Sequence, residues 1–187
     1  MKKTKSIFLT FLLIMSLSQM ALAVDHKAGG NLAFYAVTDS LYKDVYGTGN
    51  LMFGAFLSFE FMKRLELRAE ANYYKDAGEM TVSKEEIKFT LIPLVAGIRF
   101  KLINSKISPY LGAGIDFCYY KEALPERIED VSESKLGFHG ELGTYLKVTH
   151  NLFLDLNIRY LKLDVKPLNE TVKLGGIRAG VGFGIAF

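Results

Sequence analysis

The feature that most constrains the fold is a strict two-residue alternation, which is sharpest in the last thirteen residues, 175–187. Apolar side chains occupy every second position there, namely Ile177, Ala179, Val181, Phe183, Ile185 and Phe187. A period of two predicts a β-strand with one apolar face. The opposite face is mostly glycine, which weakens a strand unless another group approaches its backbone closely. Lipid on one side and a crowded interior on the other would suit such a strand, as in a transmembrane β-barrel.

The same alternation recurs along the chain and predicts eight strands, at about 31–38, 51–61, 65–74, 89–100, 107–120, 136–148, 152–160 and 175–187. In the first of these the facing is ambiguous, because both sets of alternate positions are apolar. Short turns after the second, fourth and sixth strands alternate with longer connections. An even strand number with short periplasmic turns and longer extracellular loops is typical of outer-membrane barrels. The predicted fold is therefore all-β, an eight-stranded antiparallel up-and-down transmembrane β-barrel.

The first 23 residues have the three parts of a secretory signal peptide. Lys2, Lys3 and Lys5 form a basic region, residues 7–17 are apolar, and Ala-Leu-Ala at 21–23 is a small-residue cleavage site. The predicted organisation is a cleaved signal peptide at 1–23 and one barrel domain at 24–187.

Composition excludes several classes of protein. The formal charge is +3, and removal of the three leader lysines brings it to about zero, so a basic nucleic-acid surface is not expected. Cys118 is the only cysteine, which rules out an intramolecular disulfide. After residue 23 no apolar run is long enough for a membrane-spanning helix.

A soluble lipocalin-like barrel would show the same alternation with its apolar face inward. Three features favour lipid instead. The second face is rich in glycine and apolar residues, which suits a narrow filled interior, and a closed barrel leaves no unpaired strand edge in lipid. Aromatic residues also stand at both ends of the apolar face, as in the two girdles of membrane barrels: Phe59, Phe61, Phe100 and Phe187 near the turns, and Tyr73, Tyr119 and Tyr160 near the loops.

The chain after residue 23 resembles the small eight-stranded outer-membrane barrels of the OmpA/OmpX type. Its last residues are similar to the C-terminal signal of that family, carried here by Arg178, Gly180, Phe183, Ile185 and Phe187. The resemblance implies the outer membrane of a Gram-negative-type bacterium and insertion by the barrel-assembly machinery. It says little about activity, because one barrel supports many roles.

Charged residues gather on the face predicted to point inward. They are Glu60, Glu66, Arg68, Glu70, Arg99, Lys101, Asp116, Glu141, Lys147, Asp155, Arg159 and Arg178. Buried charges need partners, and an eight-stranded interior is only wide enough for side chains. We expect an interior salt-bridge network that plugs the barrel. The alternative is a narrow porin-like solute or ion channel through it.

Two further charged sets lie at the loop end. Lysines just beyond the lipid face could bind lipopolysaccharide phosphates or simply reach toward water, at Lys75, Lys88, Lys121, Lys162 and Lys173. The longest loop, about 122–133, is acidic; it could capture cations, touch a partner surface, or be no more than a solvated loop.

A lipid-A-modifying barrel enzyme is a further alternative, since such barrels are of similar size. His150 falls in a periplasmic turn and His26 before the barrel, while His139 lacks an evident serine beside it. We therefore expect no enzyme, no cofactor and no metal.

Cys118 is expected inside the barrel, and Pro93 is expected to cause a β-bulge. The predicted function is a structural or surface-interaction role for a monomer; a soluble ligand-binding barrel is the last alternative.

Overall fold

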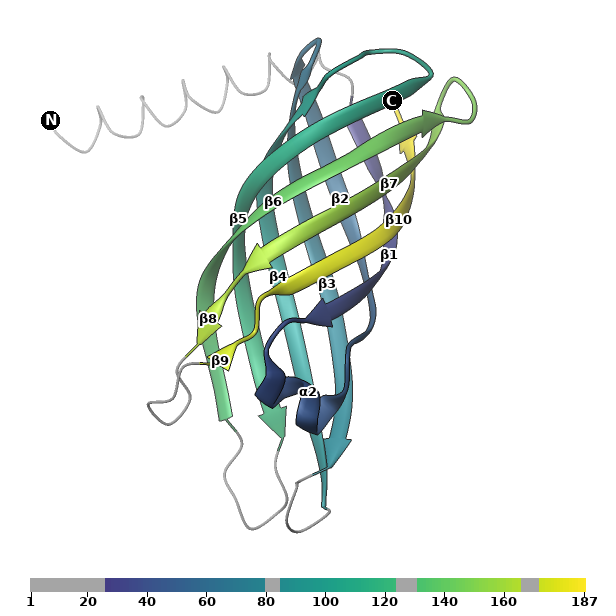
Figure 1. The fold of residues 1–187 in the computed structure, drawn as a ribbon. Helices are drawn as coiled ribbons and strands as arrows, with labels where there is room; N and C mark the ends of the chain where they lie inside the picture. The colour runs from purple at the N-terminus through teal and green to yellow at the C-terminus, as the bar shows by residue number, and fades with distance from the viewer. Residues whose placement is uncertain (1–25, 80–84, 124–130, 166–171) are drawn as a thin grey trace, which may run out of the picture.

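A computed structural model describes residues 26–79, 85–123, 131–165 and 172–187, so the expected signal peptide at 1–23 lies outside the described residues. Eight strands form a closed barrel in the order β1-β10-β7-β6-β5-β4-β3-β2, with every neighbouring pair antiparallel (Figure 1). Their bounds are β1 His26–Val37, β2 Asn50–Met62, β3 Leu65–Glu79, β4 Glu86–Lys101, β5 Ile107–Ala123, β6 Val131–Lys147, β7 Leu152–Lys162 and β10 Gly176–Ala186. The predicted up-and-down barrel is confirmed.

The barrel turns its aliphatic residues outward and its charged residues inward. Leu67 and Leu156 are 44% and 42% exposed on the outer surface, whereas Arg99 is fully buried inside. The ambiguous first strand is also settled, because Leu32 points outward and Tyr35 inward. Successive side chains of a strand point to opposite faces. Once one residue of a strand is known to face outward, the inner or outer face of every other residue in that strand follows.

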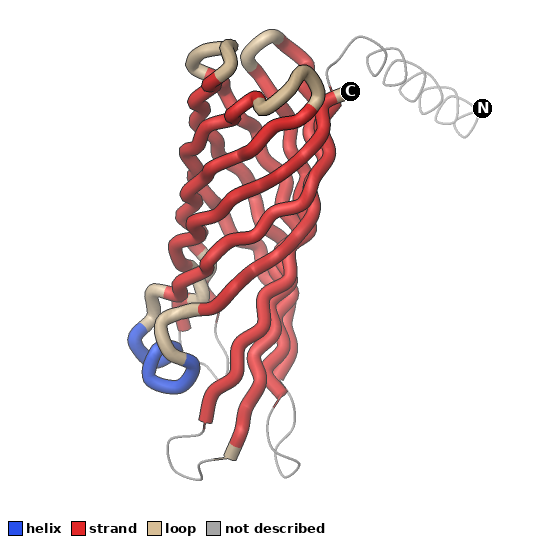
Figure 2. The backbone as a smooth tube through the Cα atoms, turned by 90° about the vertical axis from the view of Figure 1, so that its right-hand side faces the viewer, coloured by secondary structure: helices blue, strands red, loops and turns tan. Residues whose placement is uncertain are grey.

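The two ends of the barrel differ. The short turns and both chain ends of the barrel lie at one end, here called the short-turn end (Figures 1 and 2). The longer connections lie at the other, here called the helix end because it carries α2, residues Ser40–Tyr46. This is the only helix in the described residues, and it is too short to span a membrane.

Strands reach further toward the helix end than predicted. β3 continues to Glu79, and β5 and β6 include Glu122 and Glu133, which the sequence placed in an acidic loop. Residues 124–130 of that loop lie outside the described part of the chain. The apolar alternation marks only the lipid-facing length of a strand, while backbone pairing continues beyond it into water, so the pattern underestimates the strand. At the other end β1 begins at His26, five residues before its predicted start.

Two small elements have no strong sequence signal. The helix α2 covers part of the helix end; its N-cap is Asp39, whose carboxylate accepts the backbone N–H groups of Leu41 and Tyr42. The second element is a short hairpin that extends the wall beyond β7, formed by β8 Asp164–Val165 and β9 Val172–Lys173. Both are too short for periodicity to reveal them.

The expected bulge at Pro93 does not form. Pairing of β4 with β5 passes through Pro93 opposite Cys118 without a shift, and pairing with β3 keeps one register from Leu94 to Leu91. Only the pairs of Ile92 and Pro93 with β3 are missing. Proline lacks an N–H and so removes a ladder bond, but its φ is compatible with extended backbone, and no extra residue is needed. The described strands instead shift register in β2, between Glu60 and Met62.

The barrel interior has layers. Apolar and tyrosine side chains fill the part nearest the helix end, where Tyr42 of α2 packs with Phe89 and Tyr74. The middle layer carries the charged residues. A smaller aromatic cluster lies toward the short-turn end and consists of Phe56, Tyr110, Tyr145 and Phe153.

Candidate functional site

Glu70 on β3 is the centre of the interior charges. Its two carboxylate oxygens accept hydrogen bonds from Arg68 of the same strand, from Arg159 of β7 at 3.0 and 3.1 Å, and from Arg178 of β10 at 3.0 Å. The Glu70 side chain has no exposed surface. Three guanidinium groups from three strands therefore share one carboxylate.

Arg99 on β4 makes the second centre. It donates to Glu141 at 2.6 Å and to Asp155 at 2.8 Å, and its guanidinium lies over the ring of Tyr110. Arg159 joins the two centres, since it also donates to Glu141 at 2.8 Å. We call these side chains the central network; none is more than 7% exposed, and its members are Arg68, Glu70, Arg99, Glu141, Asp155, Arg159 and Arg178.

A second group of ion pairs lies nearer the short-turn end. Lys27 of β1 contacts Glu66, whose other oxygen accepts from Tyr145, and also reaches Glu60 at 3.5 Å. Lys101 of β4 donates to the same oxygen of Glu60. Sequence reasoning missed Lys27 because it placed the start of β1 after this residue. Lys27 lies an even number of positions before the inward-facing Asn31 and Tyr35. A predicted strand that began earlier would therefore have placed Lys27 inside the barrel.

Asp116 pairs with a histidine rather than with a base of the central network. Its carboxylate contacts Nδ1 of His139 on the neighbouring strand β6. The histidine ring lies against Gly97 and Gly114, on β4 and β5, at mid-height of the barrel wall. The hydrolase geometry considered from the sequence would need this histidine at the rim, where it does not lie.

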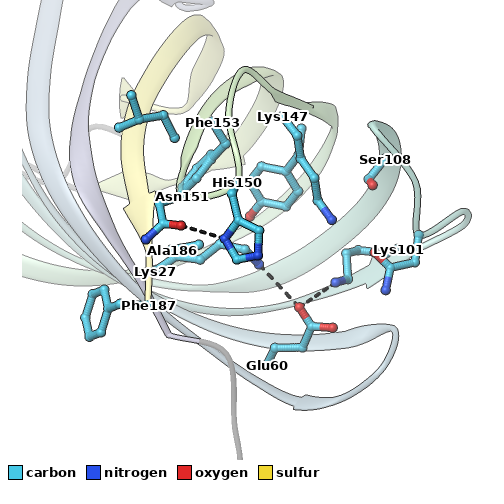
Figure 3. Close-up of a pocket in the computed structure, with 13 residues that line it drawn as sticks. Lys27, Glu60, Lys101, Ser108, Lys147, His150, Asn151, Phe153, Ala186 and Phe187 are labelled. Carbon is cyan, nitrogen blue, oxygen red and sulfur yellow. Dashed lines mark hydrogen bonds and ion pairs between the residues drawn. The ribbon is translucent and has the colours of Figure 1, made fainter.

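Lys147 departs from its predicted place. It is exposed at the end of β6 and makes no ion pair with any residue that the structure describes. It lines an open cavity of about 430 Å³ at the short-turn end, here called the vestibule, together with Lys27, Glu60, Lys101 and Tyr145. Figure 3 shows the amines of Lys27 and Lys101 meeting at Glu60, and Lys147 directed into the same cavity.

The lysines near the helix end all lie on the outside of the barrel. Lys75 and Lys121 flank Thr90 from the two neighbouring strands, and Lys88 pairs with Glu86 at 3.3 Å. The two remaining members are farther along the wall, with Lys162 ending β7 and Lys173 on β9. In the chain ranges that the structure describes, no three His, Cys, Asp or Glu side chains are grouped to hold a metal ion.

The C-terminal segment combines an inner and an outer face. Arg178 belongs to the central network, and Gly180 meets Ala33 of β1 so closely that a Cβ would lie 2.6 Å from its Cβ. Phe183, Ile185 and Phe187 point outward and are 48% to 66% exposed. The glycine face is thus where β10 closes against β1.

Residues 9–184 match the family described as the outer membrane protein beta-barrel domain. The chain belongs to this family. The protein is therefore an outer-membrane barrel of the Gram-negative type, and by the rule for such barrels its short-turn end is periplasmic and its helix end extracellular. No curated protein matches the chain in sequence.

Several solved structures share the fold of this family member. OprG from Pseudomonas aeruginosa is similar with a TM-score of 0.72 and 15% identity over 88% of this chain and 96% of OprG. Neisserial surface protein A has a TM-score of 0.66 and 18% identity, over 87% of this chain and 97% of its own. Ail, the attachment invasion locus protein of Yersinia pestis, has a TM-score of 0.60 and 17% identity, over 88% and 99%. At such identities the likeness establishes the fold alone.

Proposed function

We propose that this outer-membrane barrel is a monomer with a structural or surface-interaction role, that it is not an enzyme, and that its interior is plugged by paired charges. The observation that supports the plug is the central network, in which arginines from four strands share three carboxylates with almost no exposed surface. Apolar side chains pack between this layer and the extracellular end. An ion that crossed would have to displace partners from buried charges, which costs several kcal/mol, roughly, for each.

Single-channel recording in planar bilayers tests the plug. We expect the wild-type barrel to show no steady openings, since solvent and ions have no continuous path. A charge-neutral double variant, Glu141→Ala with Arg159→Ala, removes two facing members of the network and should produce brief openings. Steady large conductance of the wild type would contradict the proposal and favour the narrow channel instead. Heat-modifiable gel mobility would confirm that both proteins are folded.

We further propose that the extracellular lysines contact lipopolysaccharide. Lys75 and Lys121 lie at one level of the wall on either side of β4, and all five members of the set are exposed on its outer surface toward the extracellular end. Ammonium groups at this height can meet lipid phosphates as point charges. The surface-interaction role has indirect support, because two similar barrels are named as a surface protein and an attachment protein.

Thermal unfolding with and without lipopolysaccharide tests this contact. A variant with the five lysines changed to glutamine should lose the rise in unfolding temperature that lipopolysaccharide causes. A matched variant at the periplasmic end, Lys63→Gln with Lys106→Gln, should keep it. An unchanged rise in the five-site variant would show that these lysines only reach toward water.

For assembly, we propose that the barrel-assembly machinery recognises the outward aromatic and aliphatic residues of the C-terminal segment. Phe187 is 66% exposed at the end of the outer face of this segment. Phe187→Ala should lower the folded fraction in cells while leaving refolding into detergent unchanged. Equal yields in cells would contradict this role.

A further inference from the structure

We propose that the periplasmic vestibule is a binding site for a small multivalent oxyanion, a phosphate or a polycarboxylate. Its lining combines ammonium groups from three strands with neutral hydrogen-bonding side chains. They are Lys27 of β1, Lys101 of β4 and Lys147 of β6, with Asn104, Ser108 and Asn151 at the rim. The cavity has a volume of about 430 Å³ and lies at the periplasmic end of the barrel (Figure 3).

The vestibule already holds one oxyanion of its own. Glu60 places a single carboxylate oxygen between two amines, 3.5 Å from Lys27 and in direct contact with Lys101. The Glu60 and Lys101 side chains are only 9% and 5% exposed. This geometry shows that the walls bring two ammonium groups to one oxygen, as a bound anion would require. Glu60 is then an internal competitor for such a ligand.

Among the side chains that line the cavity, three lysines face a single carboxylate, that of Glu60. Lys27 is shared between Glu60 and Glu66, and Lys101 uses Glu60, but Lys147 has no carboxylate among the described residues. A positive excess in a partly enclosed mouth with low-dielectric walls raises the local concentration of anions. An anion with more than one charge can engage Lys147 and compete with Glu60 for Lys101.

The vestibule borders the central network, so an anion bound there would lie next to the charged interior. Glu66 contacts Lys27 through one carboxylate oxygen and accepts a hydrogen bond from the Tyr145 hydroxyl through the other. The same hydroxyl accepts a hydrogen bond from Arg99 of the central network. Tyr145 itself lines the vestibule. The inference does not depend on whether the barrel conducts, because the site lies on the periplasmic side of the network.

Calorimetric titration of the purified full-length barrel in detergent, with pyrophosphate in one arm and citrate in the other, tests the site. Lys147→Gln should weaken binding about tenfold, the loss expected for one charge-assisted hydrogen bond. Glu60→Gln should have the opposite effect and tighten binding about tenfold, because it removes the internal competitor and leaves Lys101 without its carboxylate. Lys75→Gln, an exposed lysine at the extracellular end, should bind as the wild type does.

Thermal unfolding gives a second readout if Glu60→Gln destabilises the barrel. A ligand that binds only the folded state raises its unfolding temperature, and the rise should be larger in Glu60→Gln than in the wild type. Binding of pyrophosphate alone identifies a phosphate site, binding of citrate alone a carboxylate site, and binding of both a site selective for charge. Absence of saturable binding and of a temperature rise with both anions overturns the proposal. Equal weakening by Lys75→Gln and Lys147→Gln also overturns it, since binding would then follow net charge alone.

Discussion

Glu70 illustrates how single residues hold the interior together. It accepts hydrogen bonds from Arg68, Arg159 and Arg178, and its side chain has no contact with solvent. Neutralising it would leave the four guanidinium groups of the central network with only two of its three carboxylates. The penalty for such an uncompensated buried charge exceeds the loss of one hydrogen bond.

The first prediction concerns this residue. Glu70→Gln keeps the shape of the side chain but removes its charge, and it should lower the free energy of unfolding by about 3 kcal/mol. Glu79→Gln, at the exposed end of the same strand, should change it by less than about 0.5 kcal/mol. Urea unfolding in detergent or lipid measures the free energy of unfolding of both variants. It can be followed by gel mobility or by tyrosine fluorescence, since the chain has no tryptophan. Equal effects of the two variants would show that Glu70 is not held by its charge.

A second prediction concerns the glycine face of the wall. A Cβ on Gly114 would lie 2.3 Å from the carbonyl oxygen of Ala96 and 2.6 Å from the ring of His139, so Gly114→Ala should destabilise the barrel by about 1–3 kcal/mol. Gly140 on the adjacent strand faces outward, with nothing within 4 Å of its Cβ position. Gly140→Ala is the matched control and should unfold in urea like the wild type. A harmless Gly114→Ala would mean that the wall is not as close-packed as described.

At the scale of elements, α2 is held by Tyr42 and Tyr46, whose rings pack against Phe89, and by the caps at its ends. Asp39 caps its first turn and also accepts the backbone N–H of Lys173 on β9 at 3.0 Å, so one carboxylate joins the helix to the neighbouring hairpin. That N–H, followed by those of Tyr42 and Leu41, lowers the pKa of Asp39 below its ordinary value of 3.8. Gly47 ends the helix with a φ of 84°.

The third prediction follows from this cap. Asp39→Ala should destabilise α2 locally by about 1 kcal/mol and speed amide exchange at residues 40–46, while the barrel strands stay protected. Because the folded-state pKa of Asp39 is below the unfolded one, its ionic contribution is complete above pH 3.8 and is lost as the pH falls through the lowered pKa. Solvent screening keeps that part below about 1 kcal/mol. Asp39→Asn keeps a cap without a titrating group, so exchange in this variant should not respond to acid.

For the whole molecule, the proposed plug of the interior makes a prediction about Cys118. This thiol is fully buried in the apolar layer between the central network and the extracellular end. In the folded barrel it should resist a small water-soluble thiol reagent added from either side, and it should react after unfolding in urea. Leu156→Cys, on the outer face, is the matched control and should react with a lipid-soluble reagent in the folded barrel. Rapid labelling of Cys118 by the water-soluble reagent would indicate an open path through the interior.

The apolar alternation predicted the eight strands, their order and the face that each presents to lipid. This was possible because a barrel in lipid imposes the same requirement on every strand: aliphatic side chains outside, and all backbone groups paired. The same pattern placed Arg99, Glu141 and Asp155 on the inner face, although it gave no indication of which acid each base would meet. The short elements α2 and β8–β9 carry no such periodic requirement and were not predicted.

By itself, therefore, the sequence determined the barrel and its inside-out distribution of residues, because those depend on a local repeat of two. Only the tertiary structure decided that three arginines share Glu70 and that Asp116 pairs with His139. It also decided that Lys147 lies in the vestibule, where none of the described carboxylates pairs with it. Partners inside a closed barrel are set by strand stagger and by the length of side chains that cross between distant strands. Those distances arise only when β10 closes against β1.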